Sequence, residues 1–195
     1  IFELTKFRLS FLVSFSAIVG FILASDNFIF IDLLVLGLSG YLVTAASVIN
    51  NQILEKELDK KMDRTKNRPL PTNRITKTTS TIISIIFMVI GLVTMTVYFN
   101  FTSGLLSLAS LLLYTFVYTP LKKVGPIAVF VGAIPGALPP LIGWVAFSGV
   151  ISIEAIIIFS IQFIWQFPHF WAIAWIYHDD YKKVGFKLLP SKGEK

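Results

Sequence analysis

Residues 31–71 read IDLLVLGLSGYLVTAASVINNQILEKELDKKMDRTKNRPLP, an apolar run that passes directly into a charged segment. The apolar part is long enough to enter a bilayer as a helix. In the charged part, oxygen-bearing side chains recur every four residues, at Asn51, Glu55, Asp59 and Asp63. Four residues advance a helix by about 40° beyond one turn, so these side chains form an acidic ridge along one face. The stretch therefore predicts a membrane helix with oxygen ligands at its polar end.

The acidic ridge has two interpretations. Mg²⁺ is held by carboxylate and amide oxygens together with water and substrate phosphates, which suits Asn51, Glu55 and Asp59. A solvated helix with charge pairs four residues apart would show the same spacing. Asp63 lies farthest from the apolar run, and we expect it to be solvated.

Six apolar runs place the chain in the membrane class. The chain has 195 residues, 55% of them hydrophobic, with a mean hydropathy of +0.76, whereas soluble domains are about 45–50% apolar. We expect membrane helices over roughly 9–24, 31–50, 81–99, 101–119, 126–147 and 152–176. Lys6 and Arg8 precede the first run without a small-residue cleavage site, which favours a first span over a signal peptide. The absence of cysteine excludes disulfides, thiolate catalysis and cysteine-ligated metals.

The net charge of +6 is confined to alternate connections between the runs. All 17 basic residues lie there: Lys6, Arg8, Lys56, Lys60, Lys61, Arg64, Lys66, Arg68, Arg74, Lys77, Lys122, Lys123, Lys182, Lys183, Lys187, Lys192 and Lys195. The other connections hold only Asp26, Asp32 and Glu154. By the positive-inside rule, the N-terminal end, the 51–80 connection and the tail are cytoplasmic. This placement supports six spans and argues against nucleic-acid binding.

Helix breakers shape the expected elements. The second helix should continue out of the bilayer until Pro69 and Pro71, since Glu, Lys and Leu favour helix. Residues 72–74 should turn, and Thr76 should cap the third span. The interior of the fifth span contains Pro135, Pro139 and Pro140 together with three glycines, and Pro168 interrupts the sixth. Such breakers are tolerated where neighbouring helices or a cavity satisfy the freed backbone groups, so both a cavity-lining pair and kinks for packing remain open.

Further phosphate-type groups lie at the same cytoplasmic ends. Arg64 and Arg68 are one turn apart, and arginine forks onto phosphate oxygens. Tyr118 and Lys122 end the fourth span at the same spacing, although an interfacial tyrosine and a snorkelling lysine would look alike. Asp180 follows the sixth span and could complete a second carboxylate site for Mg²⁺. These groups can converge, because alternate spans end on one face.

Polar side chains also lie inside the sixth span, at Gln162, Gln166 and His169. Polar groups within a membrane usually face a cavity or a partner. His169 with its aromatic neighbours could line a pocket for a flat macrocycle, or it could bond to a neighbouring helix.

The chain resembles the membrane prenyltransferases of the UbiA superfamily. Their first motif is Asn-Asp-x-x-Asp-x-x-x-Asp, which Asn51, Gln52, Glu55 and Asp59 occupy here. Within the superfamily it is similar to the branch that farnesylates haem. The matching segments are Lys6-Phe7-Arg8, NQILEKELDKKMDRTKNRPLPTNRI at 51–75, YTPLKK at 118–123, GAIPGALPPLIGW at 132–144, WQFPHF at 165–170 and DYKKVGFKLLP at 180–190.

The resemblance implies an all-α polytopic membrane helix bundle of nine helices, of which about six are present. It implies one transmembrane domain over 1–195, truncated at its C-terminus. The implied reaction transfers a farnesyl group from farnesyl diphosphate to a vinyl group of haem B. Water adds to the resulting cation, diphosphate is released, and the product is haem O.

The resemblance also implies roles for particular residues. The catalytic set is Asn51, Glu55, Asp59 and Lys122, and the metal set is Asn51, Glu55, Asp59 and Asp180. The substrate-binding set is Arg64, Arg68, Tyr118, His169 and Asp180. Mg²⁺ is the implied cofactor, and haem B is a substrate. Implied partners are farnesyl diphosphate, haem B, the lipid bilayer and a haem A synthase or terminal oxidase assembly. The implied location is the bacterial plasma membrane, with the site at the cytoplasmic face, or the mitochondrial inner membrane.

The sequence departs from the superfamily pattern at three positions. Gln52 and Glu55 replace two aspartates, and Val184 stands where a second Asp-x-x-x-Asp motif would end. The second metal is therefore open, and Lys122 or Lys183 could neutralise charge instead. Two alternatives stay open as well. One is a related enzyme that prenylates a quinone precursor or chlorophyllide, and the other is a non-catalytic membrane transporter or scaffold.

Overall fold

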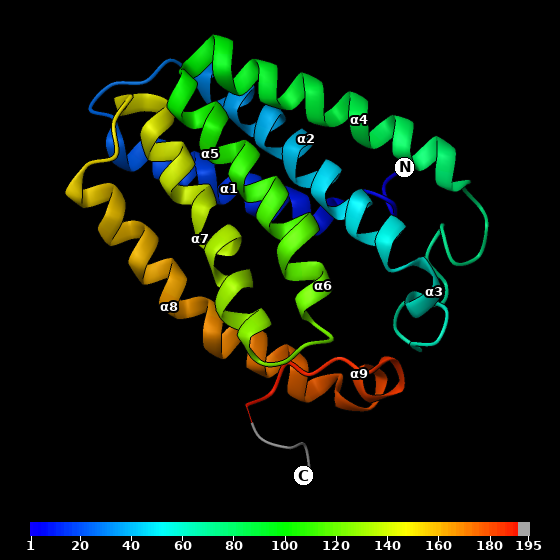
Figure 1. Cartoon of the computed structure of the whole chain (residues 1–195). Helices are drawn as coiled ribbons and strands as arrows, with labels where there is room; N and C mark the ends of the chain where they lie inside the picture. The colour runs from blue at the N-terminus through cyan, green and yellow to red at the C-terminus, as the bar shows by residue number, and fades with distance from the viewer. Residues whose placement is uncertain (191–195) are drawn as a thin grey trace.

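The computed structural model describes residues 1–190, and within them the chain forms helices and their connections without strands (Figure 1). The long helices are α1 (Phe7–Ala24), α2 (Phe30–Leu54), α4 (Lys77–Thr94), α5 (Phe101–Leu112), α7 (Ile127–Ser148) and α8 (Ile153–Ile176). The short ones are α3 (Lys56–Asp59), α6 (Thr119–Leu121) and α9 (His178–Val184). A π-helical turn, Met95–Phe99, extends α4, and a second, Leu113–Tyr118, joins α5 to α6.

Six helical segments among the described residues are long and apolar enough to cross a membrane. They are Phe7–Ala24, Phe30–Leu54, Lys77–Phe99, Phe101–Leu121, Ile127–Ser148 and Ile153–Ile176. These segments match the six predicted spans to within a few residues at most ends. The all-α prediction and the number of spans are therefore confirmed for residues 1–190.

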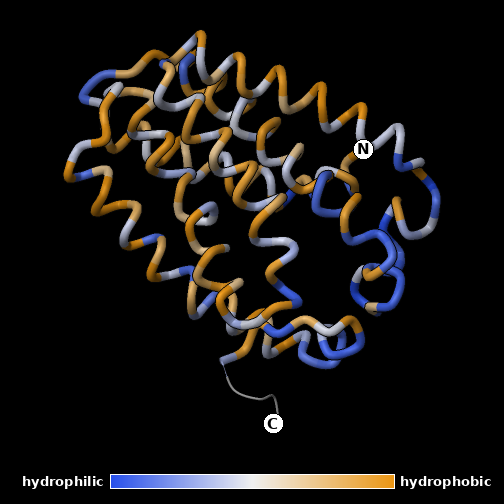
Figure 2. Tube along the Cα trace, viewed as in Figure 1, coloured by the Kyte–Doolittle hydropathy of each residue, from blue (hydrophilic) through white to orange (hydrophobic). Residues whose placement is uncertain are grey.

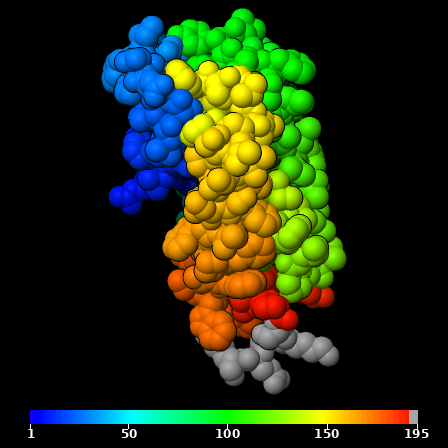
Figure 3. All heavy atoms as spheres, turned by 90° about the vertical axis from the view of Figure 1, so that its left-hand side faces the viewer, coloured from blue at the N-terminus to red at the C-terminus, as the bar shows by residue number. Residues whose placement is uncertain are grey.

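Helix α7 lies at the centre of the bundle, and α8 lies at its edge. α7 packs against α1, α5 and α8, whereas α2 packs against α1 and α4. Two thirds of the α7 span are buried (67%), against 6% of the α8 span. Figure 3 shows α8 uncovered along one face of the molecule. Large apolar side chains such as Trp165 and Trp175 are exposed there.

The close approach of α1 to α7 depends on Gly20. A Cβ atom at this position would overlap the backbone carbonyl of Pro140. Small residues let helix backbones meet in this way inside a membrane, where dispersion contacts replace the hydrophobic effect as the source of packing energy. Gly20 therefore sets the spacing between the first span and the central helix.

The prolines of α7 are accommodated by polar side chains from its neighbours. Pro140 has no N–H, which frees the carbonyl of Gly136, and Gln166 of α8 donates from Nε2 to that oxygen at 3.2 Å. Pro139 likewise frees the carbonyl of Pro135, and Ser110 of α5 donates to it at 3.5 Å. The expectation that neighbouring helices satisfy the freed groups is confirmed at these two carbonyls. These contacts favour the interpretation that the prolines serve helix packing over the interpretation that they shape a cavity.

The prediction of a continuous helix from the second span to Pro69 is wrong. α2 ends at Leu54, α3 covers only Lys56–Asp59, and the chain then turns repeatedly. Backbone groups of this connection bond to side chains instead of to a helix: Thr65 Oγ1 donates to the Asp59 carbonyl at 2.9 Å. Distant contacts therefore override local helix propensity here.

The end of the connection follows the prediction. Residues 72–74 form a turn with Asn73 at φ 57°, in the left-handed region that asparagine tolerates. Thr76 caps α4 by accepting from the Thr79 N–H at 3.0 Å.

The charged connections gather at one end of the bundle (Figure 2). Arg74 binds Glu3 at 2.7 Å, the Lys187 N–H donates to the Lys122 carbonyl at 2.8 Å, and Lys183 pairs with Asp63. The predicted gathering of the basic connections on one side is therefore confirmed for residues 1–190. Lys192 and Lys195 lie outside the described residues.

Candidate active site

The acidic ridge is inside the protein up to Asp59. Asn51, Glu55 and Asp59 are 2%, 5% and 0% exposed. The solvated-helix interpretation is therefore wrong for these three residues. Asp63 is exposed, as expected, and pairs with Lys66 and Lys183.

Thr119 orients the side chain of Asn51. Asn51 Nδ2 donates to Thr119 Oγ1 at 3.1 Å, and Thr119 Oγ1 donates its own proton to the Tyr114 carbonyl at 2.9 Å. That carbonyl is turned toward Thr119 by the π-helical turn Leu113–Tyr118, a feature frequent at functional sites. Because the hydroxyl has one proton, it can only accept from Asn51. The amide oxygen of Asn51 is thereby left available for another ligand.

Glu55 and Lys122 form a buried ion pair. Lys122 Nζ donates to Glu55 Oε1 at 2.9 Å, and both side chains are at most 10% exposed. The ammonium group also lies 4.9 Å from the ring centroid of Tyr118 and 5.5 Å from that of Phe186. Aromatic faces attract cations at such distances. The structure thus brings Glu55, which follows the second span, into contact with Lys122, which follows the fourth.

A glycine of α7 makes room for Tyr118. A Cβ atom on Gly132 would lie 2.6 Å from a ring carbon of Tyr118. The tyrosine ring therefore rests directly on the α7 backbone, with Phe170 of α8 at 5.6 Å between centroids.

Asp59 is paired on one oxygen only. Arg68 donates from a guanidinium nitrogen to Asp59 Oδ2 at 2.8 Å. The other oxygen, Oδ1, is buried without a hydrogen-bond partner in the structure. A buried carboxylate oxygen without a donor is costly, so this atom suits a bound cation.

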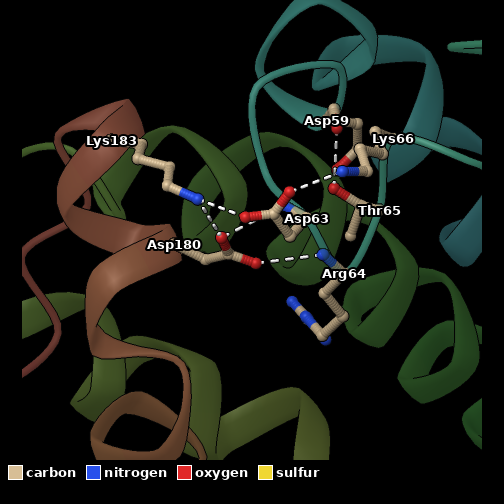
Figure 4. A network of polar contacts seen from close by, with 7 residues as sticks. All are labelled: Asp59, Asp63, Arg64, Thr65, Lys66, Asp180 and Lys183. Atoms are coloured by element: carbon tan, nitrogen blue, oxygen red, sulfur yellow. Dashed lines mark hydrogen bonds and ion pairs between the residues drawn. The ribbon is translucent and has the colours of Figure 1, made fainter.

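Asp180 attaches the segment between α3 and α4, here called the 60–76 connection, to α9 (Figure 4). Its two carboxylate oxygens accept from the backbone N–H groups of Asp63 at 3.1 Å and Arg64 at 3.0 Å. Lys183 also donates to it at 3.0 Å. These donors lower the pKa of Asp180, the Arg64 N–H most strongly. Lys183 and Lys66 lower the pKa of Asp63 to about 2. The metal assignment of Asp180 stays a prediction, since both oxygens already have donors here.

Arg64 lies among aromatic rings rather than beside a carboxylate. Its guanidinium carbon is 4.5 Å from the ring centroid of Tyr177 and 5.7 Å from that of Tyr181, whose hydroxyl oxygen lies 3.4 Å from Nη2. Among residues 1–190, its guanidinium forms no ion pair with a carboxylate. Tyr177 and Tyr181 were missed by sequence reasoning, although their i,i+4 spacing beside Asp180 could have indicated one shared face.

Lys6 is a further basic residue on which the charges of this site act. The sequence placed it before the first span and in a segment that matches the superfamily, without a role in the site. Burial, followed by the positive charges of Arg68, Lys122 and Arg64, lowers its pKa to about 7. Lys6 also adopts a left-handed backbone conformation with φ 44°. No local pattern predicts the lowered pKa, because the charges that act on Lys6 belong to residues distant in sequence.

His169 stands apart from this group. Its side chain is exposed on α8 and contacts the Phe170 ring edge-on at 6.0 Å between centroids. None of the hydrogen bonds or ion pairs found within residues 1–190 joins it to the acidic ridge. Its role in haem binding stays a prediction.

The donor set of the ridge fits a hard divalent cation. Asn51, Glu55 and Asp59 offer only oxygen, the ligand that Mg²⁺ prefers. No group of three or more His, Asp or Glu side chains in residues 1–190 is arranged to hold a metal alone. With two carboxylates and one amide, the site therefore needs substrate oxygens to complete a coordination shell, as is usual for Mg²⁺ with phosphates.

The comparison with known families decides the assignment. The model of the UbiA prenyltransferase family matches residues 13–194. The chain belongs to the UbiA prenyltransferase family. The superfamily resemblance and the fold class predicted from the motifs are thereby confirmed.

Curated UbiA-family relatives cover nearly the whole chain. Protoheme IX farnesyltransferase of Cytophaga hutchinsonii is 50% identical over 192 residues, which are 98% of this chain and 67% of that protein. The enzyme of the same name from Christiangramia forsetii is 49% identical over 189 residues, covering 97% and 63%. The one from Flavobacterium johnsoniae is 45% identical, covering 97% and 64%. The chain thus spans about two thirds of the length of these relatives.

Solved UbiA-type structures share the fold. A digeranylgeranylglyceryl phosphate synthase superposes with a TM-score of 0.82 at 22% identity, covering all of this chain and 68% of the other. A UbiA homologue from Archaeoglobus fulgidus, bound to DMAPP and Mg²⁺, gives 0.76 at 20% identity, covering 95% and 66%. At such identities the likeness concerns the helical architecture.

Proposed function

We propose that this chain catalyses the transfer of a farnesyl group from farnesyl diphosphate to a vinyl group of haem B, forming haem O. The observation that carries the proposal is the meeting of Asn51, Glu55 and Asp59 with Lys122 and Arg68 at one end of the bundle. Oxygen ligands and cations side by side suit a magnesium diphosphate. The names and identities of the curated relatives support haem as the acceptor.

The acidic and the basic residues of the site would contribute differently to the release of the diphosphate. Asn51, Glu55 and Asp59 would hold Mg²⁺, which supplies Lewis-acid stabilisation of charge on the leaving group. Arg64, Arg68 and Lys122 would bind the diphosphate oxygens as the allylic C–O bond breaks and its electron pair leaves with the diphosphate. Two of these cations are paired with acids of the ridge, so metal binding at the acids would release them toward the substrate.

The prenyl chain would then lie on the apolar side of the same site. The Tyr118 ring lies beside Lys122, and the Phe170 ring packs against Tyr118. Both rings would offer π-faces to an allylic cation. A new C–C bond to the haem vinyl carbon moves the positive charge to the porphyrin-side carbon, and water adds there with loss of a proton. We place the charged end at the cytoplasmic face of the bacterial plasma membrane, in line with the charge distribution.

The direct test is reconstitution of the purified protein in liposomes with haem B, farnesyl diphosphate and Mg²⁺, followed by mass spectrometry of the pigments. We expect a haem carrying a hydroxyethylfarnesyl group, and none when Mg²⁺ is chelated. A farnesylated phenol or chlorophyllide from parallel incubations, with haem unchanged, would instead support the related prenyltransferases. Absence of any diphosphate and Mg²⁺ binding would support the transporter or scaffold.

A further inference from the structure

The carboxylate of Asp180 on α9 has hydrogen-bond donors at both of its oxygens (Figure 4). It accepts from the backbone N–H groups of Asp63 at 3.1 Å and Arg64 at 3.0 Å, and within residues 1–190 these N–H groups have no other acceptor. Lys183 Nζ adds an ammonium group at 3.0 Å from Oδ1. A metal ion at Asp180 would therefore meet donors and a like charge at the atoms that it needs as ligands.

The other acids near Asp180 within residues 1–190 are not arranged to share an ion with it. Val184 follows one turn later and packs in an apolar cluster. Asp63 has each of its two oxygens on a lysine. Asp179 is exposed, and it lies on another face of the helix, because residues adjacent in sequence do not face the same side. The residues of α9 therefore do not fit the second Mg²⁺ that the superfamily resemblance left open.

Two tyrosines hold the side chain of Arg64, whose backbone Asp180 already holds. The guanidinium carbon lies 4.5 Å from the ring centroid of Tyr177, directly before α9, and 5.7 Å from that of Tyr181. Within residues 1–190 the only hydrogen bond of this guanidinium is to the Tyr181 hydroxyl, at 3.4 Å. A guanidinium has five N–H donors, so most of them stay free, and the residue is exposed. Because aromatic faces hold a cation without neutralising it, the charge of Arg64 is held in place and is still open to an anion.

The chain after these tyrosines supports a second cation of the site in a similar way. Phe186 packs on Tyr181 at 5.6 Å between ring centroids, and Lys122 Nζ lies 5.5 Å from the Phe186 centroid. The Lys187 N–H donates to the Lys122 carbonyl at 2.8 Å. Residues 177–187 therefore place aromatic rings and backbone contacts against cations, where a metal-binding helix would place carboxylates.

We propose that the site takes one divalent cation per chain, on the acidic ridge, and that Arg64 supplies the positive charge that a second ion would bring. Tyr177 and Tyr181 are then positioning residues, which hold the guanidinium for the anion. The inference rests on the proposed function, because the anion is the diphosphate of the prenyl substrate. Arginine stays protonated in proteins, so this charge, unlike that of a bound ion, does not depend on the Mg²⁺ concentration.

Equilibrium dialysis of the purified full-length protein against radiolabelled Mn²⁺ and inorganic pyrophosphate counts the ions, with Mn²⁺ in the place of Mg²⁺. We expect one pyrophosphate-dependent Mn²⁺ per bound pyrophosphate, in wild type and in Asp180→Asn alike, and its loss in Asp59→Asn. Two ions per pyrophosphate in wild type, the loss of an ion in Asp180→Asn, or an ion that Asp59→Asn retains would overturn the single-ion proposal. The first two outcomes would leave the proposed function standing. Retention of neither probe by wild type would overturn both.

Calorimetric titration of the same protein with pyrophosphate and Mg²⁺ tests the tyrosines. Tyr177→Leu removes the nearer ring, and we expect the affinity to fall about two- to fivefold, the range for a cation–π contact at an exposed site. Tyr177→Phe keeps the ring face and should restore the affinity of wild type. Tyr98→Leu is the matched control, since Tyr98 lies at the far end of the third span, and it should leave the affinity unchanged.

An Arg64→Met background separates positioning from support of the fold. Tyr177→Leu should cause no further loss of pyrophosphate affinity there, because the ring and the guanidinium act through one contact. A loss of the same size in both backgrounds would show that Tyr177 supports the fold and does not position Arg64. Wild-type affinity of the single variant Tyr177→Leu would overturn the positioning role as well.

Discussion

At the scale of single residues, the candidate site is a set of buried charges whose partners are incomplete. Glu55 and Asp59 each have one oxygen on a cation, and Asp59 Oδ1 has no donor. Desolvating such groups is expensive unless something completes their contacts. These buried charges contribute little to the stability of the fold. They suit a site that binds a cation and an anion together.

The hydroxyl of Thr119 gives the first prediction at this scale. Replacing it with Val removes the acceptor of the Asn51 amide, so Asn51 can rotate and present its N–H₂ to the metal. We expect the Mg²⁺ concentration needed for half-maximal activity to rise by about tenfold, as for other groups that orient a ligand. Thr119→Ser keeps the hydroxyl and should stay close to wild type. A Val variant with unchanged Mg²⁺ dependence would contradict this orientation of Asn51.

At the scale of elements, α7 shows how a membrane helix tolerates three prolines. The carbonyls freed by Pro139 and Pro140 receive donors from Ser110 and Gln166. Polar residues in α5 and α8 therefore serve the backbone of α7. The same contacts fix α8, which otherwise has little burial, at the edge of the bundle.

Gln166→Leu should destabilise the protein by about 1–2 kcal/mol, because the Gly136 carbonyl loses its donor in an apolar environment. Gln162→Leu changes the same residue type one turn earlier in α8 and should have little effect. Thermal unfolding in detergent, followed by tryptophan fluorescence, compares the two. Equal unfolding temperatures for both variants would count against this account of the α7 prolines.

The 60–76 connection depends on carboxylates with lowered pKa values, and its stability should follow pH accordingly. The pKa of Asp63 is about 2 and that of Asp180 is below its ordinary value. Lowered folded-state pKa values give stability that is complete above about pH 4, the unfolded value, and that is lost as the pH falls toward 2. Wild type should therefore lose more thermal stability between pH 6 and pH 3 than Asp180→Asn.

Asp179→Asn is the control for this experiment, since Asp179 is exposed on the same short helix. Its pH dependence should match wild type. A pH dependence of Asp180→Asn as steep as that of wild type would show that Asp180 does not hold the connection.

The elements that sequence predicts well are those governed by local chemistry. Apolar length and alternating basic charge suffice for the six spans, and a threonine before a helix suffices for the cap at Thr76. The path after Leu54 escapes prediction, because the Arg64 N–H bonds to Asp180 more than a hundred residues later. The contact of Arg64 with the Tyr177 ring escapes it for the same reason: the two residues are distant in sequence and close in space.

At the scale of the whole molecule, the chain separates an apolar bundle from one charged end. Figures 1 and 2 show the 55–76 connection and α9 together at that end. Farnesyl chains and haem partition into membranes, while diphosphate and Mg²⁺ belong to water. A site at the boundary gives each reactant access from its own phase.

The central claim is that the ridge holds magnesium diphosphate for prenyl transfer, and Asp59 is the residue on which it depends most. The decisive measurement is the rate of haem O formation by the full-length protein in liposomes, compared between Asp59→Asn and the exposed neighbour variant Asp63→Asn. Asp59→Asn should lower the rate by at least about a hundredfold, the loss expected when a group that stabilises a leaving-group charge is removed. Asp63→Asn should stay within about threefold of wild type. Folded Asp59→Asn protein that forms haem O at the wild-type rate would contradict the account.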